Sequence, residues 1–98
     1  MATATASRDG DTLRIQGELD FDSVAGLWET TGALFVANSP LQVDLGGVSR
    51  ANSAGVALLV AWLRQARKQQ RKLVFINVPV QMQAIIQVAD LETLLPMI

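Results

Sequence analysis

The pattern of apolar and polar positions at the start of the chain predicts two short strands joined by a tight turn. Residues 3–8 have weak strand character, whereas residues 12–18 alternate clearly, with Leu13 and Ile15 on one face and polar residues on the other. A period of two residues is typical of a half-buried strand. The Asp-Gly step in Asp9-Gly10-Asp11 suits the hairpin turn between them.

Apolar positions then recur at helical spacing, which predicts an amphipathic helix over residues 22–37. Asp20 and Asp22 stand just before it, and either is a suitable N-cap. Asn38-Ser39-Pro40 ends the helix, because proline cannot continue it. The residues of the predicted core stripe are Val24, Leu27, Thr31, Leu34 and Phe35.

The central part of the chain predicts a buried strand, a loop and a long helix. Residues 41–45 are short and apolar, as in a central strand, and residues 46–50 contain two glycines and are predicted to be a loop. Ser53 opens a helix that extends to about Gln70.

The last third predicts a buried strand, a third helix and a short tail. Residues 73–76 form the strand, and Pro79 lies near the start of the helix. The tail, residues 91–98, is expected to pack back on the sheet. The predicted core face of the third helix consists of Met82, Ile85, Ile86 and Ala89.

This order of elements predicts a single α/β domain over residues 1–98, because 98 residues suffice for one two-layer core. Strands that alternate with helices indicate a largely parallel sheet with helices covering it. We therefore expect a mixed, largely parallel β-sheet of four to five strands covered by three helices.

Composition excludes several kinds of chemistry. The chain has no His, Cys or Tyr, so it can build neither a Ser-His-Asp nor a Cys-His nucleophile, nor a zinc or haem site of the usual kind. No lysine follows the glycines as a nucleotide-binding P-loop requires. A carboxylate pair could still act as acid and base, but caps, turns and solvated charges explain Glu18, Asp20, Asp22 and Asp44 better. We expect no catalysis, metal, cofactor or small-molecule substrate.

The sequence shows no targeting segment. The first seven residues lack the basic start and apolar run of a signal peptide. The longest uncharged apolar stretch, residues 51–63, is shorter than the roughly 20 residues that span a bilayer. The absence of cysteine fits the cytosol, and we expect no direct membrane insertion.

The basic residues are concentrated in one segment, although the net charge is only −1. Such a cluster could bind nucleic acid or lipid headgroups. Cations near a helix C-terminus also offset the helix dipole, and this interpretation is preferred, so no nucleic-acid partner is expected. The cluster comprises Arg64, Arg67, Lys68, Arg71 and Lys72.

The turn at residues 52–55 is the first candidate site. It places Ser53 at a helix N-terminus, beyond the carboxyl end of a strand, which is where ligands bind in open α/β sheets. A helix N-terminus also favours a phosphate, whether bound or covalently attached. The alternative is that Asn52 or Ser53 merely caps the helix.

The long helix is unusually apolar. Its core stripe is assigned to Val56, Leu59, Val60, Leu63 and Ala66, which leaves apolar residues on its sides and back. Either this chain covers both sides of the helix, or its outer face binds a partner; the shortness of the chain favours the partner. Trp28, at the edge of the first helix's core stripe, fits the core and an interface equally well. The residues on the sides and back are Ala54, Ala57, Leu58, Ala61 and Trp62.

Several segments resemble the STAS domain, a family named after sulfate transporters and antagonists of anti-sigma factors. The family has a strand ending in Asp-Leu-Ser, a short loop, and Asp-[Ser/Thr]-x-Gly opening a helix. The matching segments are Ile15 to Asp20, Leu41 to Leu45 and Val48 to Gly55. Within the family, four pieces most resemble the small STAS subunit of Mla-type phospholipid-transport ABC complexes: Gly17 to Asp20, Leu27-Trp28-Glu29, Val48-Ser49-Arg50 and Ala57-Leu58-Leu59.

This resemblance implies a cytoplasmic accessory subunit, peripheral to the inner membrane, that binds an MlaF-like ATPase subunit and touches neither ATP nor lipid. It would support the assembly and activity of a complex that maintains outer-membrane lipid asymmetry. The expected contact residues are Trp28, Arg50, Asn52, Ser53, Ala54, Gly55, Ala57, Leu58 and Ala61.

The resemblance also implies an alternative. Ser53 occupies the position that is phosphorylated in sporulation-type members of the family, which would make the chain an anti-sigma factor antagonist switched by phosphorylation. Asn52 replaces the family's usual Asp, which counts against recognition by a kinase. Ala54 replaces the Ser or Gly that often follows in the family, and Gly46 replaces the Ser of Asp-Leu-Ser.

Overall fold

Four strands form one mixed sheet in the order β1-β2-β3-β4. The computed structural model describes residues 4–36 and 40–98, without the side chains of residues 33–36. β1 and β2 form an antiparallel hairpin, and β3 and β4 then run parallel to β2. The strands are β1 (Ala4–Asp9), β2 (Thr12–Leu19), β3 (Gln42–Ala51) and β4 (Val74–Ile76).

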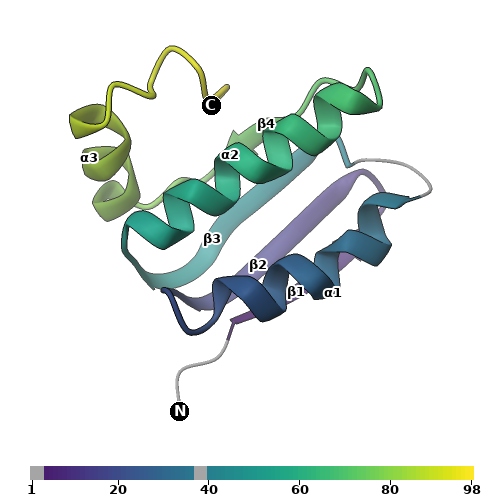
Figure 1. Cartoon of the computed structure of the whole chain (residues 1–98), viewed down its shortest axis with the longest axis horizontal. Coiled ribbons are helices and arrows are strands. Elements are labelled where there is room, and N and C mark those ends of the chain that lie inside the picture. Colours follow the sequence, from purple (N-terminus) through teal and green to yellow (C-terminus); the bar gives the residue numbers. More distant parts are fainter. Residues whose placement is uncertain (1–3, 37–39) are drawn as a thin grey trace.

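Three helices complete the fold: α1 (Val24–Val36), α2 (Ser53–Lys68) and α3 (Val80–Val88). Figure 1 shows α1 and α2 side by side in front of the sheet, with α3 beside the first turns of α2. The β2–α1–β3 and β3–α2–β4 connections step the same way across the sheet, so right-handed crossovers place both helices on one face. The predicted α/β fold, with a mixed sheet and three helices, is confirmed.

The core lies between this sheet face and the helices. On β2, the predicted alternation sends Leu13 and Ile15 inward, and Val43 of β3 lies on the same side; all three are fully buried. The opposite sheet face carries polar residues such as Arg14 and Gln16, which are exposed. A sheet with one face packed on the core and the other in solvent shows this alternation of buried and exposed residues.

β3 is longer than predicted. The structure continues the strand through residues 46–50, which were expected to form a loop. The register slips where Gly47 pairs with Gln16, and a Cβ on Gly47 would lie 2.9 Å from the carbonyl oxygen of Ile15. A bulge with glycines hides the two-residue period, because glycine has no side chain to alternate.

Other predicted boundaries need smaller corrections. α1 begins at Val24, after a turn in which the Asp20 carboxylate accepts hydrogen bonds from the backbone N–H groups of Asp22 and Ser23. α2 ends at Lys68 rather than near Gln70. The predictions for Thr3, for Asn38-Ser39 and for the side chains of Leu34 and Phe35 lie outside the described residues.

The C-terminal prediction is largely confirmed. Met82 and Ile86 are buried and Ile85 is half-buried, but Ala89 is exposed and caps the C-terminus of α3. The tail returns to the sheet as expected, since Met97 forms a parallel bridge with Phe75.

A buried hydrogen bond joins the two large helices. The indole Nε1 of Trp62 on α2 donates to the hydroxyl of Thr31 on α1 at 3.0 Å. The Thr31 hydroxyl in turn donates to the carbonyl oxygen of Leu27 at 2.8 Å. Both side chains are fully buried, so this pair satisfies polar groups that water cannot reach.

Replacing Thr31 with valine should therefore destabilise the domain by about 1–3 kcal/mol, because the Trp62 N–H would remain buried without an acceptor. Thr31→Ser is the matched control, since it keeps the hydroxyl and loses only a methyl group. Urea denaturation measures both changes. Equal losses in the two variants would contradict a role for the hydrogen bond.

Asp44 forms a small polar network on the open sheet face. Its Oδ1 accepts from the backbone N–H of Gly46 at 2.9 Å and from the side-chain amide of Asn77 at 3.0 Å. Arg14 lies 3.9 Å from the other carboxylate oxygen. The Gly46 and Asn77 hydrogen bonds, helped by Arg14, outweigh partial burial and lower the pKa of Asp44 below its ordinary value of 3.8.

Because the folded pKa is the lower one, Asp44 stabilises the fold above about pH 4 and loses this effect as the pH falls through the folded pKa. Asp44→Asn should be less stable than the wild type at pH 7, and the difference should shrink on acidification. Urea midpoints between pH 3 and 7 test this. A difference that does not vary with pH would show that the charge is irrelevant.

Candidate docking surface

The turn between β3 and α2 is capped by Asn52. The Asn52 backbone is extended, with φ −121°, and its side-chain oxygen accepts from the backbone N–H of Ala54 at 2.9 Å. Ser53 is the first residue of α2 and is exposed. Of the two predicted caps, the structure selects Asn52, which leaves the Ser53 hydroxyl available to another molecule.

Three contacts, with β2 and α3, hold this turn in place. The Asn52 N–H donates to the carbonyl oxygen of Leu19, at the end of β2. The Ala51 N–H donates to the side-chain oxygen of Gln81, on α3. Gly55 lets α2 approach β2, since a Cβ there would lie 2.9 Å from the Cβ of Leu19. The turn is therefore a preorganised surface.

The sequence did not reveal the role of Gln81. A glutamine in the first turn of a helix is ordinary, and its partner Ala51 is 30 residues away along the chain. Only the packing of α3 against the start of α2 brings the two together (Figure 1).

The expectation that the sides of α2 are exposed is wrong for three residues. Ala54 and Leu58 are each 5% exposed, and Trp62 is fully buried. α1 packs against one flank of the helix and α3 against the other. The chain therefore covers both flanks itself, and Ala54, Leu58 and the buried Gly55 present no side chain to a partner.

A narrow outer stripe of α2 remains accessible. Ser53 and Ala57 are exposed one turn apart, and Ala61 is half-buried in the next turn. Arg64 and Lys68 continue the stripe to the C-terminus of the helix, where it becomes basic. The N-terminal part of the stripe is small and uncharged.

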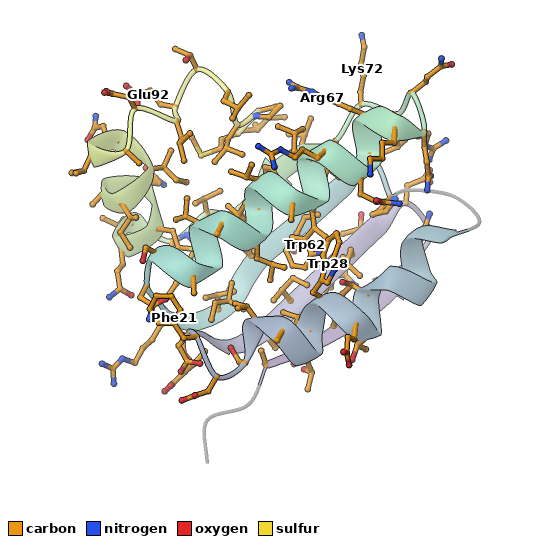
Figure 2. All side chains as sticks on the ribbon, viewed as in Figure 1. Phe21, Trp28, Trp62, Arg67, Lys72 and Glu92 are labelled. Carbon is orange, nitrogen blue, oxygen red and sulfur yellow. The ribbon has the colours of Figure 1, made fainter. Side chains whose placement is uncertain are left out.

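Two exposed aromatic side chains project close to α2 in the view of Figure 2. Trp28, on α1, is 39% exposed and lies near the buried Trp62 in Figure 2. Phe21 is 73% exposed and lies beside the start of α2 in the same view. Sequence analysis missed Phe21; the available signal was an aromatic residue between two aspartates in a turn. We call Phe21, Trp28, Ser53, Ala57 and Ala61 the docking surface.

Arg50 lies next to the turn, in a shallow pocket of about 290 Å³. Its side chain is exposed and has no ion-pair or hydrogen-bond partner within residues 4–36 and 40–98. The pocket lies at the carboxyl ends of β2 and β3, where open α/β sheets bind ligands. Its lining residues are Glu18, Leu19, Asp20, Arg50, Ala51, Asn52 and Gln81.

In the described part of the chain, no three acidic residues gather in a group that could hold a metal ion. The carboxylates of Asp20 and Asp44 accept hydrogen bonds from nearby backbone N–H groups. None of the helices described is long and apolar enough to cross a membrane.

Comparison with known proteins gives matches to a family model and to a curated relative. Residues 2–96 match the family model described as "Mlab, STAS domain". The chain is 40% identical to the intermembrane phospholipid transport system binding protein MlaB of Escherichia coli over 60 residues. This match spans 61% of the chain and 60% of the E. coli protein, less than two thirds of its length. The MlaB of Shigella flexneri matches equally.

Solved structures share the fold. An anti-sigma-factor antagonist (STAS) domain protein from Planctomyces limnophilus superposes with a TM-score of 0.74, covering 100% of this chain and 90% of that one, at 21% identity. An anti-sigma factor antagonist from Mycobacterium paratuberculosis superposes with a TM-score of 0.73, covering 99% and 85%, also at 21% identity.

The Asn52 cap can be tested by two substitutions. Asn52→Ala should cost about 1 kcal/mol of stability, because the Ala54 N–H loses its acceptor. Asn52→Asp should retain full stability, since a carboxylate both accepts this bond and favours the helix N-terminus. Urea denaturation at pH 7 compares them. An Asp variant as unstable as the Ala variant would contradict the capping role.

Proposed function

Since this chain belongs to the MlaB group of STAS domains, we propose that it is a non-enzymatic accessory subunit of a phospholipid-transport ABC complex. It would bind the ATPase subunit of that complex at the inner membrane, on the cytoplasmic side. The observation that carries the proposal is the docking surface: an exposed, uncharged helix stripe with two aromatic side chains beside it, around a rigid turn.

The docking surface has the properties of a protein interface. Exposed aromatic residues such as Phe21 and Trp28 bury a large area at a low cost in side-chain entropy, and tryptophan is enriched among interface hot spots. The small side chains of Ser53 and Ala57 allow the backbone of a partner to come close. Arg50 and Asn52 supply polar groups at the rim of the surface.

The preorganised turn supports a constitutive role. Its hydrogen bonds from Ala51 and Asn52 and the Gly55 contact exist without a partner, so little ordering entropy is lost on binding. A subunit that binds the folded ATPase but not its unfolded form stabilises it by mass action. In this way the chain would support assembly and activity of the complex, and thereby outer-membrane lipid asymmetry, without touching ATP or lipid.

Ala57→Arg should lower affinity for the ATPase subunit more than 100-fold, because a buried arginine without a partner costs about 3–5 kcal/mol. Ala61→Arg should have a similar effect, and Ser53→Ala should weaken binding only modestly. The measurement is pull-down of the ATPase from the native host, followed by titration of the purified pair.

Ala84→Arg is the matched control, since Ala84 is also an exposed alanine on a helix but lies on α3. Circular dichroism verifies that every variant is folded. Undiminished recovery of the ATPase by Ala57→Arg would refute this docking surface, while failure of the wild type to recover any ATPase would refute the proposed function itself.

A second candidate function is antagonism of an anti-sigma factor under control of phosphorylation. It is favoured by the exposed Ser53 hydroxyl at a helix N-terminus, where a phosphate is electrostatically stabilised. Asn52 speaks against it, because the family's usual carboxylate is missing. Incubation with host extract and labelled ATP, followed by mass analysis of Ser53, separates the two functions.

A further inference from the structure

A second hollow lies at the opposite end of α2 from the docking surface. Arg67 follows Ser53 by 14 residues, about 21 Å along the helix axis at 1.5 Å per residue. The hollow measures about 280 Å³ and is formed by the end of α2, the start of β4 and the C-terminal tail. Its apolar walls are Leu63, Leu73, Val74 and Pro96, and its cations are Arg67, Arg71 and Lys72.

The charge around this hollow is largely uncompensated. The segment from Arg64 to Lys72 holds five of the eight basic residues and no acidic one. Arg71 is paired with Asp11 at 3.3 Å. Arg67 and Lys72 are exposed and have no ion-pair partner in the described part of the chain. Figure 2 shows both along the same edge of the molecule.

The helix dipole does not account for this cluster. Its effect is confined to the last turn, which contains Arg67 and Lys68. Arg64 lies before that turn, and Lys72 lies beyond the helix. The rest of the chain has three basic and nine acidic residues, a net charge of −6, so positive charge is concentrated at this end. Concentrated like charges repel one another unless an anion compensates them.

We propose that this hollow binds an acidic segment of a partner protein, with one aliphatic side chain in the hollow and carboxylates against Arg67 and Lys72. The volume lies at the lower edge of the range of small-molecule sites and can hold one large side chain. Leu63 and Leu73 are 3% and 2% exposed and form the floor of the hollow. The half-buried Val74 and Pro96 supply its accessible apolar surface, which a projecting peptide side chain can contact.

The test is a titration of the full chain with a peptide. Binding is measured from the NMR chemical shifts of the backbone amides of Leu63, Leu73 and Val74. The probe is a capped heptapeptide with one leucine between two pairs of glutamates. Two control peptides replace the leucine with glycine or the glutamates with glutamines. Vesicles of phosphatidylcholine with 30% phosphatidylglycerol serve as a separate arm.

We expect the leucine-glutamate peptide to shift these amides and both control peptides to bind at least fivefold more weakly. Arg67→Gln should weaken binding about three- to fivefold, as for loss of an exposed ion pair. Arg64→Gln is the matched control, because it removes the same charge one turn earlier, outside the lining of the hollow. It should change affinity less than twofold.

Three outcomes overturn the proposal. Equal binding of the glycine peptide would mean that the hollow takes no side chain. Equal effects of Arg67→Gln and Arg64→Gln on affinity would mean that the peptide is attracted by the overall positive charge and does not bind in the hollow. Binding to the anionic vesicles alone would assign this end of the protein to a membrane surface.

Discussion

The packing of α2 on three sides is the constraint on which the rest of this structure depends. The sheet lies beneath the helix, α1 covers one flank and α3 the other. Trp62 fills the junction with α1 and is held by the Thr31 hydroxyl. Because so small a domain needs most of the apolar surface of α2 for its own core, only the outer stripe and the two ends of the helix can face a partner.

The N-terminal end of α2 is held in a fixed position. Its first turn is fixed by the Asn52 cap, by Gln81 from α3 and by the close approach of Gly55 to Leu19. These contacts come from elements far apart in the sequence, so the turn is rigid only in the folded domain.

The two ends of α2 differ in the partner surface they suit. The first turns combine small residues with neighbouring aromatic ones, while the last turns carry Arg64, Arg67 and Lys68. Under the two proposals, association through the first end would be dominated by burial of apolar area. Association through the second end would be electrostatic and would weaken as salt rises. A single helix would thereby offer two contacts with separate physical origins.

The sequence alone determined the order of the elements and the location of the turn. The structure contains the elements that local patterns predicted. These patterns are the two-residue period of β2, the helical period of α1 and the proline at the start of α3. The STAS resemblance is likewise carried by short segments, and the match over residues 2–96 confirms it. Local periodicity predicts these features because it reflects which face of an element is buried.

Only the tertiary structure decided which apolar residues of α2 are free. The sequence placed Ala54, Leu58 and Trp62 on the same accessible sides as Ala57 and Ala61, but the first three are buried in the folded domain. The tertiary structure also extends β3 through its glycines, where no side-chain pattern exists. It leaves Phe21 exposed. Periodicity shows that a helix is apolar all round, but what covers each side depends on contacts between segments distant in the chain.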